Sequence, residues 1–347
     1  MRVHGGNIDR KQNLLDFSAN INPLGMPDAV RSAIIQAASD CVHYPDPYCT
    51  ALTGKLSEYE NIPASQIVCG NGAADLICRI AYAFRPRHAL IPVPTFSEYA
   101  FALHETGCQV TEYPLDDAQN YTLHEDFLSG ICNGIDLVFL CTPNNPTGQL
   151  ICPGLLHQIA EKCRRYGILL VCDECFLRFC TDAERYSLRP HSNENVIILN
   201  AFTKLYAIPG LRLGYALCGA EQNAQKLRQT GQFWSVSVPA QAAGIAALEE
   251  TDWIPKTVRY VSAERAFLSA ALRKAGLYVY DGAANFLLLR APADFADRME
   301  QHQILVRRCA DFRGLTDEHF RIAVRAHDEN LALISALGEV DPWQNQS

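Results

Sequence analysis

The sequence predicts an α/β protein with a large, mixed and mostly parallel sheet, followed by a smaller α+β domain. Its 347 residues, of which 48% are hydrophobic and 20% charged, suit one large globular domain or two fused domains. Between about residues 65 and 220, short apolar runs alternate with longer amphipathic stretches. Such alternation indicates parallel strands whose sheet is covered by helices on both faces. The pattern changes beyond about residue 235.

The alternating region supplies most of the expected elements. A first helix is expected at residues 28–39, after Pro23 and Pro27. Further helices are expected at residues 73–84, 97–106 and 154–166. Strands are expected at residues 88–91, 109–113, 137–141, 168–172, 196–200 and 213–217.

The C-terminal region should contain a long helix at about 252–275 and strands at 286–290, 304–307 and 320–324. We therefore predict three regions. They are an N-terminal arm (1–40) that packs with the small domain, a large domain (41–235) and a small C-terminal domain (236–347).

Charge and hydropathy exclude several classes of protein. The chain has 30 Lys+Arg against 38 Asp+Glu, and it has no basic run that would neutralise nucleic-acid phosphates. Its apolar runs are strand-sized, whereas a membrane helix needs about 20 apolar residues. Residues 1–7 contain no apolar signal-peptide core. We expect a cytoplasmic protein without a membrane or nucleic-acid partner.

The 14 cysteines are scattered, and several lie within apolar runs. In a long chain without a signal peptide, free buried thiols are expected rather than disulfides. Cys172 and Cys175 form a short pair, but no second pair completes a zinc site, so no metal is expected.

Two segments at strand ends suit the binding of a ligand, although each is also a common turn. Residues 69–75 (CGNGAAD) form a small-residue turn that opens a helix, where free backbone N–H groups suit a phosphate. Residues 141–148 (CTPNNPTG) form a rigid turn that presents Asn145 as a fixed amide.

Two further segments carry ionisable groups. Asp173 ends an apolar strand, where a carboxylate either meets a cation or hydrogen-bond donors or caps the next helix. Lys204 lies between apolar residues, with Arg212 eight positions later. A lone lysine is commonly solvated, but a buried lysine has a lowered pKa that suits Schiff-base chemistry.

In this order and spacing, the four segments resemble those of the pyridoxal-phosphate enzymes of the aspartate aminotransferase fold, over nearly the whole chain. The resemblance implies that Lys204 holds the cofactor as a Schiff base and that Asp173 pairs with the pyridine nitrogen. It also implies that Asn145 hydrogen-bonds the phenolic oxygen and that Phe96 stacks on the ring. The implied phosphate site consists of Gly72, Ala73, Thr203 and Arg212, joined by Tyr44 from the neighbouring subunit of a homodimer.

Two positions depart from the family pattern. Ala201 stands where a Ser or Thr is common three residues before the lysine. Phe176 stands three residues after the aspartate, where aminotransferases usually carry a Tyr that donates to the cofactor. The loss of that donor argues against plain transamination.

Residues 4–7 (HGGN) and 16–25 (DFSANINPLG), with Arg307 and Arg321, resemble the threonine-phosphate decarboxylases of the cobalamin pathway. That family is similar to the histidinol-phosphate aminotransferases, which share residues 44–47 (YPDP). The resemblance implies decarboxylation of O-phospho-L-threonine to (R)-1-amino-2-propanol O-2-phosphate. The two anionic ends of this substrate call for two cationic clamps. The candidate for the substrate carboxylate is Arg321. The candidates for the substrate phosphate are Arg307, Arg325, His4, Gly5 and Gly6. Asn22 and Asn145 are further candidate substrate-binding residues.

Three alternatives remain open at this stage. The first is an aminotransferase of the histidinol-phosphate type. The second is a decarboxylase of O-phospho-L-serine, and the third is a non-catalytic binding protein with this fold. One methyl group discriminates two substrates by only ~1–3 kcal/mol, so the sequence does not separate the two phospho-amino acids. Lys204, Asp173, Asn145 and Arg212 are all present, which argues against the non-catalytic alternative.

Overall fold

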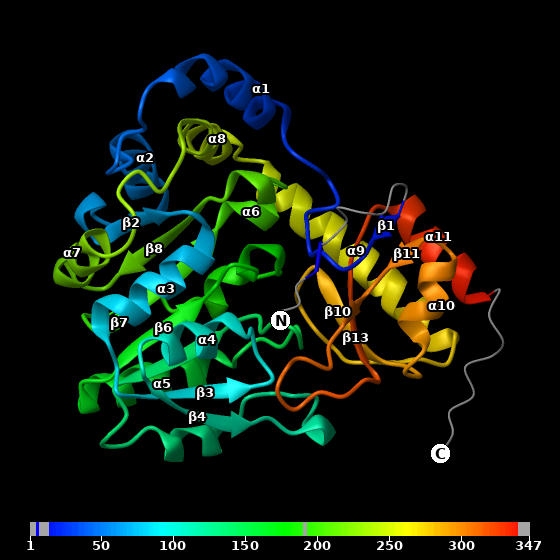
Figure 1. Ribbon diagram of the computed structural model, residues 1–347. Coiled ribbons are helices and arrows are strands. Elements are labelled where there is room, and N and C mark those ends of the chain that lie inside the picture. Colours follow the sequence, from blue (N-terminus) through cyan, green and yellow to red (C-terminus); the bar gives the residue numbers. More distant parts are fainter. Residues whose placement is uncertain (1–4, 7–13, 190–192, 339–347) are drawn as a thin grey trace.

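The computed structural model describes residues 5–6, 14–189 and 193–338. Its larger unit contains a seven-stranded sheet with the order β2-β8-β7-β6-β5-β3-β4 (Figure 1). Strand β8 is antiparallel to both of its neighbours, and the other pairs are parallel. This confirms the predicted fold class. The strands are β2 (Ile67–Gly70), β3 (His88–Val93), β4 (Gln109–Pro114), β5 (Leu137–Cys141), β6 (Leu169–Asp173), β7 (Val196–Ala201) and β8 (Gly214–Cys218).

Helices cover both faces of this sheet, and strand side chains alternate between the two resulting cores. Phe139 of β5 packs in the core beneath α3, α4 and α7, whereas Leu140 packs in the core beneath α2, α5 and α8. Burial on both faces explains why the central strands β5, β6, β7 and β8 are continuous apolar runs, whereas the edge strand β4 is largely exposed and mixed in sequence. The helices are α2 (Thr50–Glu60), α3 (Gly72–Phe84), α4 (Glu98–Glu105), α5 (Pro153–Tyr166), α6 (Phe202–Leu205), α7 (Glu221–Gln229) and α8 (Val238–Glu249).

The smaller unit has a four-stranded antiparallel sheet, β12-β13-β10-β9. Phe320 and Ile322 of β13 pack in a core with α9, α10 and α11, so alternation turns Arg321 to the opposite face of the sheet. The elements are α9 (Trp253–Lys274), β9 (Tyr278–Val279), β10 (Phe286–Arg290), α10 (Phe295–Gln301), β11 (Ile304–Leu305), β12 (Arg307–Arg308), β13 (His319–Ala323) and α11 (His327–Gly338).

The structure differs from the predicted arrangement of regions in three places. Helix α8 packs against α1 (Asp28–Ala37) and α2, so the large unit extends to about residue 250. A Cβ added at Gly244 would lie 2.7 Å from the Leu213 side chain, which shows how closely α8 approaches the large unit. Within the N-terminal arm, β1 (Leu15–Asp16) pairs with β11 of the small unit, whereas α1 packs on α8. The strand expected at residues 304–307 is instead two short strands in different sheets.

In the ranges that the structure describes, no helix combines the length and the apolar character needed to cross a bilayer.

Candidate active site

A cavity of about 360 Å³ lies between the two units, at the carboxyl ends of β5, β6 and β7. Its volume suits a cofactor-sized ligand, and strand ends of this kind commonly form binding sites. Both units contribute to its lining, which includes Gly5, Ser18, Asn20, Ala73, Phe96, Tyr99, Asn145, Asp173, Cys175, Phe176, Thr203, Lys204, Arg212, Arg307, Phe312 and Arg321.

Asp173 is the last residue of β6, and its carboxylate is buried. Its Oδ1 accepts the backbone N–H of Cys175 at 2.9 Å, and its Oδ2 accepts the hydroxyl of Tyr99 at 2.7 Å. Burial raises the pKa of Asp173, while these hydrogen bonds oppose the rise. A cationic ring nitrogen beside this carboxylate would favour its charged form further.

Lys204 lies in α6, directly after β7. Burial lowers the pKa of Lys204 to about 8, and the neighbouring charges of Arg321 and Arg212 lower it further. An amine with this pKa is partly unprotonated near neutral pH, so Lys204 can attack an aldehyde.

An anion site is built around the first turn of α3. The first backbone N–H groups of a helix have no partner within the helix, and the helix dipole favours negative charge there. Gly72, at φ +78°, opens the helix, and a Cβ at this position would lie 2.6 Å from Arg212 Nη2. Thr203 and Ala73 line the same part of the cavity. Backbone amides and a guanidinium group together suit a phosphate.

Two buried arginines enter the cavity from the small sheet, where Arg307 of β12 pairs in register with Arg321 of β13. Arg321 Nη1 donates to Asn145 Oδ1, and Nη2 donates to the carbonyl of Ser18 at 3.0 Å. Burial lowers the pKa of Arg321 to about 10. Arg307 Nη2 donates to Asp311 at 2.6 Å. Two guanidinium groups in one cavity suit a ligand with two anionic groups.

The structure brings most of the predicted site residues to this cavity. Ten of them line it: Gly5, Ala73, Phe96, Asn145, Asp173, Thr203, Lys204, Arg212, Arg307 and Arg321. Gly72 is not in the lining but lies beside Arg212, which is. Gly6 donates its N–H to Ser18 Oγ at 2.8 Å. His4 lies outside the described residues. Tyr44 is 78% exposed and stacks on Trp234, with 4.4 Å between the ring centroids.

Two residues predicted to bind substrate lie outside the cavity lining. The Asn22 amide donates to the Leu205 carbonyl at 2.7 Å and to Thr257 Oγ1 at 2.8 Å, so it ties the arm to both units. Arg325 Nη2 pairs instead with Glu329 at 2.7 Å.

The sequence analysis missed Asn20 and Tyr99. Asn20 lines the cavity at 2% exposure, and its Oδ1 has no hydrogen-bond partner among the described residues. Asn20 and Asn22 stand two positions apart in the same segment, so the sequence pattern alone did not separate them. Tyr99 follows Phe96 by three residues, and helical spacing at the start of α4 was the available signal.

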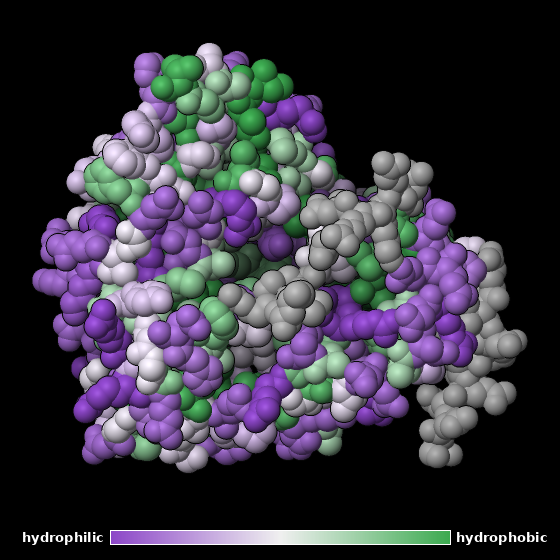
Figure 2. All heavy atoms as spheres, in the orientation of Figure 1, coloured by the Kyte–Doolittle hydropathy of each residue, from purple (hydrophilic) through white to green (hydrophobic). Residues whose placement is uncertain are grey.

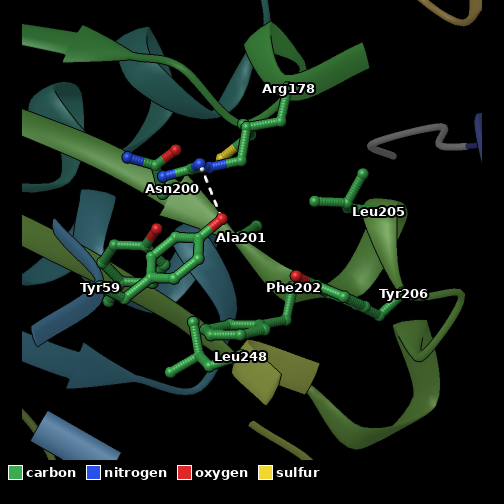
Figure 3. A pocket seen from close by; sticks show the side chains of 10 residues that line it. Tyr59, Arg178, Asn200, Ala201, Phe202, Leu205, Tyr206 and Leu248 are labelled. Atoms are coloured by element: carbon green, nitrogen blue, oxygen red, sulfur yellow. Dashed lines mark hydrogen bonds between the residues drawn. The ribbon is translucent and has the colours of Figure 1, made fainter. Parts of the chain in front are cut away.

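A second pocket shares Cys175 and Ala201 with the lining of the cavity and is also bordered by Asn200 and Phe202 (Figure 3). Arg178 Nη1 donates there to the hydroxyl of Tyr59 at 3.0 Å (Figure 3). The second pocket has a volume of about 10 Å³, which leaves room for about one water molecule and excludes the pocket as a substrate site.

Residues 12–337 match the family described as aminotransferase class I and II. The chain belongs to this family. It is 38% identical over 97% of its length to the threonine-phosphate decarboxylase of Salmonella typhimurium, of which it covers 96%. It is 32% identical over 97% of its length to the bifunctional adenosylcobalamin biosynthesis protein CobDQ of Leptospira interrogans, of which it covers 41%.

Solved structures of this family have the same fold. The histidinol-phosphate aminotransferase of Clostridium acetobutylicum superposes with a TM-score of 0.87 at 28% identity, covering 93% of this chain and 98% of its own. The L-threonine-O-3-phosphate decarboxylase of Porphyromonas gingivalis superposes with a TM-score of 0.80 at 25% identity, also covering 93% of this chain and 98% of its own. The histidinol-phosphate aminotransferase of Sinorhizobium meliloti, in complex with pyridoxal-5'-phosphate, gives 0.81 at 23% identity, covering 92% of this chain and 89% of its own.

Proposed function

We propose that this chain is a pyridoxal-phosphate-dependent decarboxylase that converts O-phospho-L-threonine to (R)-1-amino-2-propanol O-2-phosphate for cobalamin biosynthesis. One observation carries the proposal. Arg307 and Arg321 face the same cavity as Lys204, in a chain 38% identical to a threonine-phosphate decarboxylase. A substrate with a carboxylate and a phosphate complements the charges of both arginines.

The side chains around the cavity fit pyridoxal phosphate by their chemistry. Lys204 offers a reactive amine, Asp173 offers a buried carboxylate for the ring nitrogen, and Phe96 offers a ring to stack on. Asn145 offers an amide for the phenolic oxygen. The start of α3 with Thr203 and Arg212 offers the phosphate site. When bound, this cofactor supplies an electron sink for the bond that breaks.

The substrate residues act by orientation. We assign the carboxylate to Arg321 and Asn145 and the phosphate to Arg307 and Gly5, with Asn20 as a further polar contact. Fixing both anionic ends sets the rotation about the substrate Cα, and that rotation selects which bond is aligned for cleavage. Lys204 Nζ, with a pKa of about 8, carries a proton at neutral pH and delivers it to Cα after CO₂ leaves.

The departure at Phe176 supports decarboxylation over transamination. Phe176 lines the cavity and packs edge-on against Phe286, with 5.1 Å between the ring centroids. It therefore supplies an apolar wall where a phenol would supply a hydrogen-bond donor.

We also propose that the protein works as a homodimer, with Tyr44 of each subunit reaching the cofactor phosphate of the other. Figure 2 shows hydrophobic surface over the end of the molecule formed by α1. Large apolar side chains are exposed in and near this region, and such patches commonly mark interfaces. They are Ile35, Val42, Tyr44, Tyr48, Phe233 and Trp234. All 14 cysteines are free, which supports work in a reducing compartment such as the cytoplasm.

Product analysis tests the proposed function. The holoenzyme is incubated with O-phospho-L-threonine, O-phospho-L-serine or histidinol phosphate, with and without 2-oxoglutarate. We expect CO₂ and an amine phosphate from phospho-threonine without any acceptor. Transamination of histidinol phosphate that requires the acceptor, with no CO₂ from either phospho-amino acid, would instead establish the aminotransferase alternative that the Clostridium neighbour represents.

A further inference from the structure

A polar cluster of three buried side chains and one half-exposed carboxylate, Asp117, joins the two units. Asp117 and Tyr121 come from the large unit, between β4 and β5, whereas Tyr280 follows β9 and His319 begins β13 of the small unit. Tyr121, Tyr280 and His319 are each at most 4% exposed. None of the four belongs to the cavity lining given above.

The hydrogen bonds of this cluster have a defined direction. His319 Nδ1 accepts the backbone N–H of Thr316 at 3.2 Å, so in the neutral ring the proton is on Nε2. Burial lowers the pKa of His319, which favours this neutral form. Nε2 lies 3.2 Å from the hydroxyls of both Tyr121 and Tyr280. The Tyr280 hydroxyl in turn donates to Asp117 Oδ1 at 2.5 Å.

The cluster is therefore a chain of donors that runs from His319 through Tyr280 to the carboxylate of Asp117. Arg290 Nη1 holds the other oxygen of that carboxylate at 3.2 Å. The two phenols are also in ring contact, with centroids 5.3 Å apart. A small-domain strand is thus tied to the large domain through the buried Tyr121, Tyr280 and His319, whose hydrogen-bond partners are costly to remove, and through the half-exposed Asp117.

The same strand carries Arg321, and its neighbour β12 carries Arg307 opposite Arg321. His319 stands two residues before Arg321 on β13, so their side chains share one face of the sheet. The carbonyl of His319 accepts the N–H of Cys309 at 2.9 Å. Cys309 leads to Phe312, which lines the cavity and lies 5.3 Å beneath the Arg307 guanidinium. A shift of His319 relative to the large unit would therefore move both arginines together.

We propose that Tyr280 and His319 are positioning residues that fix Arg307 and Arg321 relative to Lys204 and thereby determine reaction specificity. The proposal rests on the proposed function. The arginines hold the two ends of the substrate, and the large domain holds Lys204 and Asp173. The relative position of the two units therefore sets which bond at Cα is aligned. Displacements of about 1 Å can cost about 100-fold in rate.

The test compares Tyr280→Phe, which removes only the bridging hydroxyl, with Tyr278→Phe. Tyr278 is 51% exposed and packs edge-on against Tyr280, so it is a matched control. With O-phospho-L-threonine in D₂O, two quantities are measured. One is the CO₂ released, and the other is the exchange of the Cα hydrogen for deuterium in the remaining substrate. For Tyr280→Phe we expect kcat/KM to fall roughly 5- to 30-fold and the ratio of exchange to CO₂ to rise several-fold. Tyr278→Phe should match the wild type.

A second readout is independent of turnover. In the ligand-free proteins, backbone amides of β13 should exchange with solvent faster in Tyr280→Phe than in Tyr278→Phe, while β6 is unchanged. The dissociation constant for pyridoxal phosphate should also be unchanged. Unaltered exchange at β13, or an unaltered product ratio, overturns the inference. A wild-type enzyme that releases no CO₂ overturns the proposed function, while the amide exchange still tests the link between the units.

Discussion

The chemistry of Lys204 depends on its burial. In water a lysine amine titrates near 10.5, whereas the pKa of Lys204 is lowered to about 8. Only the unprotonated amine attacks an aldehyde, so attachment of pyridoxal phosphate should accelerate about tenfold per pH unit below pH 8 and level off above it. The measurement is the rate at which visible absorbance appears when apoprotein and cofactor are mixed. Lys204→Ala should give no such band. A rate that still climbs through pH 10 would contradict the role of burial.

Arg321 provides the second residue-scale prediction. Its guanidinium is buried and held by Asn145 and Ser18, so it is fixed for a planar carboxylate. Arg321→Gln should lower kcat/KM for O-phospho-L-threonine by roughly 10- to 100-fold, because a charge-assisted hydrogen bond contributes about 1.5–3 kcal/mol. Arg325→Gln is the matched control. Arg325 lies four residues away and pairs with Glu329 instead, so equal losses in both variants would refute the assignment.

Among the elements, α3 carries the predicted phosphate site at its first turn. Gly72→Ala should weaken pyridoxal-phosphate binding at least about tenfold, because a Cβ would lie 2.6 Å from Arg212 Nη2 and because φ is +78°. Titration of the apoprotein with cofactor measures the dissociation constant. Gly54→Ala is the control, since Gly54 lies in α2 and a Cβ there meets no atom within 4 Å. Unchanged affinity in Gly72→Ala would remove α3 from the site.

The central strands of the large sheet were predicted well because they are buried on both faces, whereas the short edge strand β2 was not predicted. Strand β5 has the predicted bounds, and β6 and β8 begin one residue later than predicted. Helix α8 was assigned to the wrong unit because its alanines, such as Ala240 and Ala243, give it no distinct apolar stripe. The prediction of one continuous strand at 304–307 was wrong, because the chain passes from one sheet to another at Val306.

The site was predicted less evenly than the fold. Motifs at strand ends predicted Asp173 and Lys204, and the structure places both side chains at the cavity, because residue type and spacing specify their position. The substrate residues depend on how the small unit meets the large one. That relation is not encoded locally, so Asn22 was chosen where Asn20 faces the cavity, and Arg325 was added to Arg307. Tyr99 was missed because its contact with Asp173 joins α4 to a distant strand.

At the scale of the whole molecule, the proposed dimer predicts a shared site. Tyr44 is exposed on one subunit and is assigned to the cofactor phosphate of the other. Tyr44→Ala and Lys204→Ala should each be inactive alone. After subunit exchange, half of the dimers are hybrids, and each hybrid has one site with both residues intact. Activity should therefore recover to about a quarter of the wild-type value. No recovery, despite exchange demonstrated by mass-tagged chains, would exclude the shared site.

The central claim is that two arginines and one lysine in a single cavity direct the loss of CO₂ from a phosphorylated amino acid. The most direct measurement uses O-phospho-L-threonine labelled with ¹³C at the carboxyl carbon, in a sealed reaction without any keto acid. The account predicts one labelled CO₂ for each aminopropanol phosphate formed, over many turnovers. Retention of the label in a keto acid, or in unreacted substrate while the bound cofactor remains intact, would contradict it.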